Sequence, residues 1–200
     1  MATKTIEELE LGIYTMGCEL RKLRKAAPGV EVTNYLFDTL DGTVSLSDLF
    51  AGNDKLLAIH NMGQACRYCT LWADGINAFL PHLESSMSVV LLSKDDPATQ
   101  RRQANARGWR FRSASHGGGD YIREQSSQEG ESNTPGAVFY ELREQKIYRK
   151  NSCTFGPGDL YCSHWHLLGL AGLDSADWTP QYNYWRRPQK LDDGGENVVD

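Results

Sequence analysis

Two cysteines separated by two residues, Cys66 and Cys69, are the part of this sequence best suited to chemistry. A mostly apolar run of strand length, residues 56–62, precedes them, and apolar residues at helical spacing follow. The pair therefore lies at a predicted strand-to-helix junction. Unpaired backbone amides and the helix dipole stabilise a thiolate there, and Arg67 adds a nearby positive charge. These features predict a redox pair in which Cys66 is the nucleophile.

The second cysteine of the pair has a complementary position. One helical turn further along, we expect Cys69 to be protected by helix packing. It would still be close enough to attack a mixed disulfide on Cys66 and release the reduced substrate. The same two residues could instead be core cysteines or metal ligands. The motif rule for cytosolic proteins favours the redox pair, and the total of five cysteines is too few for a disulfide scaffold.

A second candidate for chemistry lies near the C-terminus, at Cys162 and His166. Four residues apart, they share a face if the segment is helical. Two ligands cannot fill a tetrahedral zinc site, but four could do so if Cys66 and Cys69 joined them. This alternative requires the last helix to meet the helix of the cysteine pair. We favour the redox pair and expect no metal ion or cofactor.

Composition limits the classes of partner. The 200 residues are 40% hydrophobic and 24% charged, which is typical of one globular domain. A net charge of −5 gives no general attraction to phosphate backbones, so nucleic acid is not expected as a partner. The acidic N-terminus lacks an apolar signal segment, and no apolar run reaches the length of a membrane span. We therefore expect a cytoplasmic protein with no membrane partner, and leave assembly into a homo-oligomer open.

An N-terminal helix is predicted, because apolar residues recur at steps of three and four from Ile6 to Leu23. Thr5 and Glu8 fit a capping box at its start, and Pro28 stops it. The apolar stripe is under three heptads long. We expect it to pack against its own domain, with dimerisation as the alternative.

The middle of the chain follows the order of an α/β protein. Residues 56–62 and 88–93 are typical of strands covered on both faces, and a predicted helix follows each. This order implies a parallel pair with a right-handed crossover. Residues 115–133 are rich in Gly, Ser, Gln and Glu and predict a long loop. Residues 137–142 and 146–149 then predict a hairpin.

Together these motifs resemble the thioredoxin superfamily, and more narrowly a domain-of-unknown-function branch related to alkyl hydroperoxide reductase and thiol-specific antioxidant proteins. The resemblance rests on Cys66-x-x-Cys69 running into Leu71-Trp-Ala-Asp-Gly75, with support from residues 46–50, 80–83, 108–111 and 185–187. It implies an α/β thioredoxin-like fold, a central mixed sheet flanked by helices, with an N-terminal helical extension. We divide the chain into an N-terminal helix (1–29), a thioredoxin-like domain (30–188) and a flexible acidic tail (189–200).

The resemblance also implies roles for single residues. In that superfamily a cis proline before a later strand faces the cysteines and presents backbone to an extended substrate. Thr134 and Pro135 stand at the matching place, and with Arg67 and Tyr68 they are the expected substrate-binding residues. His60, six residues before Cys66, matches a buried acid that moves the proton of the resolving cysteine. A proton relay and a hydrogen-bonded core histidine are equally open for it.

Two departures from the family patterns matter for function. Thioredoxins carry an aromatic residue before the first cysteine and Gly-Pro between the two, where this chain has Ala65 and Arg67-Tyr68. Peroxiredoxins need a proline and a threonine where this chain has Ile59 and Gly63, so peroxide reduction ranks below disulfide exchange.

We therefore expect a thiol–disulfide oxidoreductase. Its partners would be a protein or small-molecule disulfide or thiol substrate and a separate electron donor. The alternative from another class is a non-enzymatic binding module that uses the long polar loop and the aromatic C-terminal segment as its interaction surface.

Overall fold

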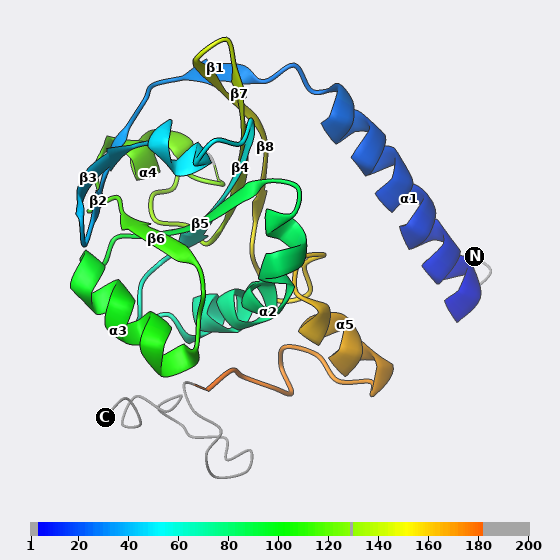
Figure 1. The fold of residues 1–200 in the computed structure, drawn as a ribbon. Helices are drawn as coiled ribbons and strands as arrows, with labels where there is room; N and C mark the ends of the chain where they lie inside the picture. Colours follow the sequence, from blue (N-terminus) through cyan, green and yellow to red (C-terminus); the bar gives the residue numbers. More distant parts are fainter. Residues whose placement is uncertain (1–3, 129, 182–200) are drawn as a thin grey trace.

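The protein is built on one eight-stranded mixed sheet in the computed structural model, which describes residues 4–128 and 130–181 (Figure 1). The strand order is β1-β8-β7-β4-β5-β6-β2-β3. The strands are β1 (Val30–Val32), β2 (Leu36–Thr39), β3 (Gly42–Ser45), β4 (Lys55–Asn61), β5 (Ser88–Ser93), β6 (Arg112–Ser115), β7 (Gly136–Arg143) and β8 (Lys146–Thr154). The helices are α1 (Ile6–Ala26), the 3-10 turn η1 (Asp48–Phe50), α2 (Arg67–Glu84), α3 (Pro97–Arg107), α4 (Asp120–Gln125) and α5 (Ser163–Leu170).

The centre of the sheet is parallel, as the order of elements predicts. β4 pairs with β5, and β5 with β6, in parallel register, with Ile59 opposite Leu91. β7 lies antiparallel on the other side of β4 and forms the predicted hairpin with β8. The helix predicted after residues 88–93 is α3, which Asp96 caps and Pro97 begins. A central mixed sheet with flanking helices is thus the observed architecture.

Each face of the sheet carries its own apolar core. On one face Leu56 and Ala58 of β4 pack with Tyr121 and Ile122 of α4. On the other face Ile59 packs with side chains of α2 and with Trp165 of α5. Successive residues of β4 therefore point into two different cores, which explains why the strand is apolar along nearly its whole length.

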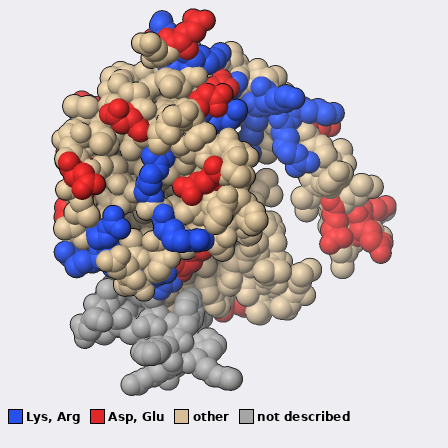
Figure 2. Space-filling model, viewed as in Figure 1, with Lys and Arg blue, Asp and Glu red and all other residues tan. Residues whose placement is uncertain are grey.

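The expectation that α1 packs against its own domain is wrong. The helix forms as predicted, with both hydrogen bonds of the Thr5 and Glu8 capping box in place, yet none of its residues is buried. Figures 1 and 2 show it standing away from the body of the protein over most of its length. The apolar period fixes one face of the helix but not the surface that covers it, and the hydrogen bonds of α1 to Tyr161 and Asn151 both involve Arg24 in its last turn.

The segment 115–133 is not a single long loop. It contains the short helix α4, whose Tyr121 and Ile122 are both 2% exposed. Two apolar residues within six are too few to give a helical period, which is why the polar composition concealed the element. The predicted tail 189–200 and the motif at 185–187 lie outside the described residues. None of the described helices has the length and apolar character needed to cross a membrane.

Candidate active site

The two cysteines meet at the beginning of α2. Cys66 is the N-cap of the helix, Cys69 lies in its first turn, and a disulfide joins their sulfur atoms across a Cα–Cα distance of 5.3 Å. The backbone N–H of Cys69 donates a hydrogen bond to the Cys66 sulfur over 3.1 Å. An amide and a helix N-terminus thus point at the Cys66 sulfur, an arrangement that stabilises negative charge on it after reduction.

The two cysteines differ in exposure. Cys66 is half-buried and reaches the surface, whereas Cys69 is 3% exposed and belongs to the packed part of α2. The two residues therefore differ in their access to solvent.

A tight turn before α2 sets the position of Cys66. The Cys66 N–H donates to the Gly63 carbonyl at 3.0 Å, and the Gln64 N–H donates to the Asp95 carboxylate at 2.7 Å. Gly63 has a φ of +115°, and a Cβ there would lie 2.6 Å from an Asp95 oxygen. Only glycine fits this position. Sequence reasoning missed Asp95, because the residue follows a different strand and shows no local signal.

Aromatic side chains support the first turn of α2. The rings of Tyr68 and Trp165 stack with centroids 6.4 Å apart, and Trp72 stacks on Phe155 at 5.8 Å. The Trp72 indole N–H also donates to the Asp159 carboxylate at 2.9 Å. These contacts bring α5 against the start of α2 and fix the helix that carries both cysteines.

The four residues of the zinc alternative do not assemble into a ligand set. α5 does meet α2, but Cys162 is buried at the start of α5, and the His166 imidazole is engaged with the Asp159 carbonyl at 3.0 Å. Cys66 and Cys69 are joined to each other. Within residues 4–128 and 130–181, no group of three or more His, Cys, Asp or Glu side chains is placed to hold a metal ion.

The implied cis proline is wrong: the Thr134–Pro135 bond is trans, like every peptide bond within the described ranges. Trans is the favoured state of an X–Pro bond, and the backbone here is satisfied without a cis bond. The Pro135 carbonyl accepts a hydrogen bond from the Phe155 N–H at 2.9 Å. Asn133 donates to the Met62 carbonyl at 3.4 Å, so this segment does lie beside the chain that leads to Cys66.

His60 belongs to a buried network of tyrosines. Its Nε2 lies 2.8 Å from the Tyr121 hydroxyl, and the Tyr140 hydroxyl donates to that of Tyr121 at 3.2 Å. Strand alternation puts His60 on the α4 face of β4 with Ala58, whereas α2 packs on the other face. Among the described residues no hydrogen bond joins His60 to Cys66 or Cys69. The contacts made by the ring are those of a hydrogen-bonded core histidine.

Burial of His60 predicts that the protein loses stability in acid. The pKa of His60 is lowered from 6.5 to about 3, mainly by burial and in smaller part by the charges of His116 and Arg149. Between these values the unfolded chain binds more protons than the folded one, so the free energy of unfolding falls as pH falls. His60 alone should account for a loss of about 2 kcal/mol between pH 7 and pH 5.

Chemical denaturation at several pH values measures this loss. The His60→Gln variant should show a shallower pH dependence, whereas His82→Gln, which removes an exposed histidine, serves as the control. An NMR titration of the wild-type imidazole is a second measurement that does not depend on a variant. A His60 ring that titrates near pH 6.5 in the folded protein would contradict the prediction.

Comparison with known proteins places this geometry in context. A family model described as "Bacterial protein of unknown function (DUF899)" matches residues 8–190. No curated protein matches the chain.

Among solved structures, peroxidoxin BcpB of Mycobacterium tuberculosis is 17% identical, with a TM-score of 0.52 over 74% of this chain and 99% of that one. AhpC of Enterococcus faecalis is 14% identical, with a TM-score of 0.53 over 72% of this chain and 90% of that one. The bacterioferritin comigratory protein of Xanthomonas campestris is 13% identical, with a TM-score of 0.52 over 72% and 96%. At this identity the likeness establishes the fold, which is the thioredoxin-like fold expected from the motifs.

Proposed function

The chain belongs to the DUF899 family of bacterial proteins of unknown function, and from that premise we propose that it is a thiol–disulfide oxidoreductase acting through Cys66 and Cys69. One observation carries the proposal. A disulfide joins the two cysteines at a helix N-terminus, where the residue Cys66 is half-buried and the residue Cys69 is 3% exposed. A nucleophile and a protected resolving thiol need this inequality of access.

The proposed reaction moves two electrons. In the reduced protein the Cys66 thiolate attacks a substrate disulfide, forms a mixed disulfide and expels one substrate thiolate, which takes up a proton. The Cys69 thiol then loses its proton, attacks the Cys66 sulfur and releases the second substrate thiolate. The substrate disulfide is reduced and the Cys66–Cys69 disulfide forms. A separate dithiol donor must return the pair to the reduced state.

Four residues are proposed to contact the substrate. Arg67 and Tyr68, both half-buried, follow Cys66 directly, and the Arg67 guanidinium adds positive charge beside the thiolate. Thr134 and Pro135 are proposed to line the substrate path from the neighbouring segment, even with a trans bond, because Asn133 ties that segment to Met62. Protein disulfides and small-molecule disulfides are both in this substrate class.

The role of His60 as a proton relay stays a prediction. A pKa of about 3 makes the buried His60 imidazole a weak base. A proton relay would therefore require water to reach the ring. The His60→Gln variant described above tests the role in the same preparation. A relay predicts a slower resolving step with an unchanged attack by Cys66.

Peroxide reduction is a weaker candidate. The neighbours named above include a peroxidoxin and a protein with alkyl peroxide reduction activity. Their likeness to this chain is in fold, and this chain has Ile59 and Gly63 where peroxiredoxins need a proline and a threonine. We therefore propose disulfides, rather than peroxides, as the oxidising substrates.

A redox titration tests the proposal directly. The protein is equilibrated with thiol and disulfide buffers spanning about −120 to −300 mV, the range of known dithiol proteins, then quenched in acid. Its free thiols are alkylated and located by mass spectrometry. Cys66 and Cys69 should change together in one two-electron transition.

Cys18 and Cys153, which are free thiols outside the pair, provide an internal control and should remain labelled throughout. A pair that never forms a reversible disulfide would favour the binding-module alternative instead.

A further inference from the structure

α1 carries an apolar face that the rest of the described chain leaves uncovered. Seven large apolar side chains on this helix are between 50% and 76% exposed, and five of them are Ile6, Leu9, Ile13, Met16 and Leu23. Together with Leu20 they recur at alternating steps of three and four residues, which places them along one side of the helix. We call this set of six residues the α1 stripe. A helix of this kind gains most of its stability from packing, so a partner that covers the stripe would stabilise α1.

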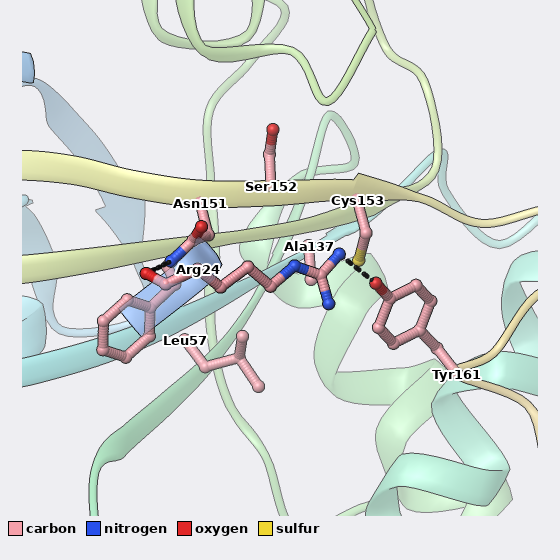
Figure 3. Close-up of a pocket in the computed structure, with 8 residues that line it drawn as sticks. Arg24, Leu57, Ala137, Asn151, Ser152, Cys153 and Tyr161 are labelled. Carbon is pink, nitrogen blue, oxygen red and sulfur yellow. Dashed lines mark hydrogen bonds between the residues drawn. The ribbon is translucent and has the colours of Figure 1, made fainter. Parts of the chain in front are cut away.

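The last turn of α1, which we call its root, is hydrogen-bonded to the rest of the protein, and these contacts fix the direction of the helix. Arg24 donates through its guanidinium to the Tyr161 hydroxyl, and the Asn151 side chain donates to the Arg24 carbonyl at 3.2 Å. Figure 3 shows the Arg24 side chain lying across a cavity of about 230 Å³ between β8 and Tyr161. All of these contacts lie in the last turns of the helix. The stripe runs from the free end at Ile6 to Leu23, next to this attachment, and its Leu20 is half-buried.

The charges of α1 are separated along its length. Near its start lie Glu7, Glu8 and Glu10, and its second half carries Arg21, Lys22, Arg24 and Lys25 with a single acidic residue, Glu19. Figure 2 shows the acidic group at the free end and a basic group toward the root. Each sign suits the local end of the helix dipole, and the separation also gives the helix a polarity that a partner can read.

We propose that two copies of this chain dimerise by packing their α1 stripes against each other in antiparallel orientation. In the register that pairs Ile6 with Leu23 of the second copy, Ile13 meets Met16 across the two-fold axis. The acidic third of each helix then lies beside the basic third of the other. A parallel pair would set like charges together, so charge favours the antiparallel arrangement. The contact is isologous and closes as a dimer.

The dimer is independent of the proposed redox function, because the stripe contains none of the residues assigned to it. Sedimentation velocity over a concentration series provides the first test. The wild-type chain should sediment as a dimer that dissociates on dilution. A wild-type chain that remains monomeric up to its solubility limit would overturn the proposal.

A matched pair of variants identifies the face that is used. Ile13→Glu with Met16→Glu places two charges in the centre of the stripe and should raise the dimer Kd by at least roughly tenfold. Leu11→Glu with Tyr14→Glu adds the same charge to the same turns of the helix. Leu11 and Tyr14 are 66% and 67% exposed and lie outside the stripe, so this control should remain dimeric. A dimer that survives the stripe variant, or a control that dissociates equally, would overturn the proposal.

Charge reversal tests the orientation. Changing Glu7, Glu8 and Glu10 to lysine should weaken the dimer at low salt, because both ends of each helix then become basic. Adding the reverse change at Arg21, Lys22 and Lys25, each to glutamate, should restore it. Both variants should exchange disulfides at the wild-type rate, which separates failure of the dimer from failure of the proposed function. A dimer insensitive to both changes would contradict the antiparallel arrangement.

Discussion

Replacing Cys66 by serine is expected to lower the rate of disulfide exchange by on the order of a thousandfold, because a serine hydroxyl is not ionised at neutral pH and cannot replace a thiolate. Cys69 offers no substitute nucleophile, since it is 3% exposed. The measurement is reduction of a model protein disulfide with dithiothreitol as the electron donor. Cys162→Ser provides the control, because Cys162 is buried and lies outside the pair.

The companion variant, Cys69→Ser, separates the two steps of the reaction. Cys66 can still attack, but without the resolving thiol the protein should accumulate as a mixed disulfide with its substrate. Mass spectrometry under non-reducing conditions detects the added mass on the peptide that contains Cys66. Equal residual activity in Cys66→Ser and in the Cys162→Ser control would show that exchange does not use this pair.

Gly136→Ala is expected to cause the largest loss of stability, about 3 kcal/mol, from a single added methyl group. Gly136 is the first residue of β7, where it pairs with His60 on one side and with Thr154 on the other. A Cβ at this position would lie directly against the backbone carbonyl of Cys153 and 2.6 Å from the Ser127 Cβ. A backbone carbonyl held in a central sheet has no room to move aside.

A second glycine gives the matched control for this measurement. Gly75 lies exposed on α2, and a Cβ there meets no atom within 4 Å. Gly75→Ala should therefore stabilise the protein by about 1 kcal/mol through helix propensity. Urea denaturation of both variants gives the two values. The substitution is the same at both sites and only the packing differs. Changes of the same sign and size in the free energy of unfolding would therefore contradict the prediction.

The parts of the fold that follow from short stretches of sequence were predictable. β4 and β5 are apolar runs bounded by polar turns, and Asp96 with Pro97 marks the start of α3 by capping chemistry. The predictions that were wrong are those that depend on tertiary contacts. The α1 stripe has the pattern of a packed helix, yet the pattern does not specify which surface covers it. α4 buries Tyr121 from within a polar segment, and its burial depends on residues distant in sequence.

The candidate site divides in the same way. Cys66 and Cys69 carry their own signal, because spacing and a strand-to-helix junction are local properties. The Asp95 carboxylate that anchors the turn and the Trp165 ring that supports Tyr68 come from elsewhere in the chain. Nothing near either residue in sequence identifies it. The trans bond at Pro135 likewise depends on its surroundings rather than on the dipeptide.

The two outer strands of the sheet affect how this protein can meet others. β1 pairs with β8 over three residues, and β3 pairs with β2 over four. An incoming extended chain would find only these few backbone donors and acceptors, which is too little for strong β-augmentation. Because these edge strands are short, they also protect the protein from edge-to-edge aggregation. The two edges of the sheet therefore offer little to a substrate or to a second copy, and recognition falls to other surfaces of the molecule.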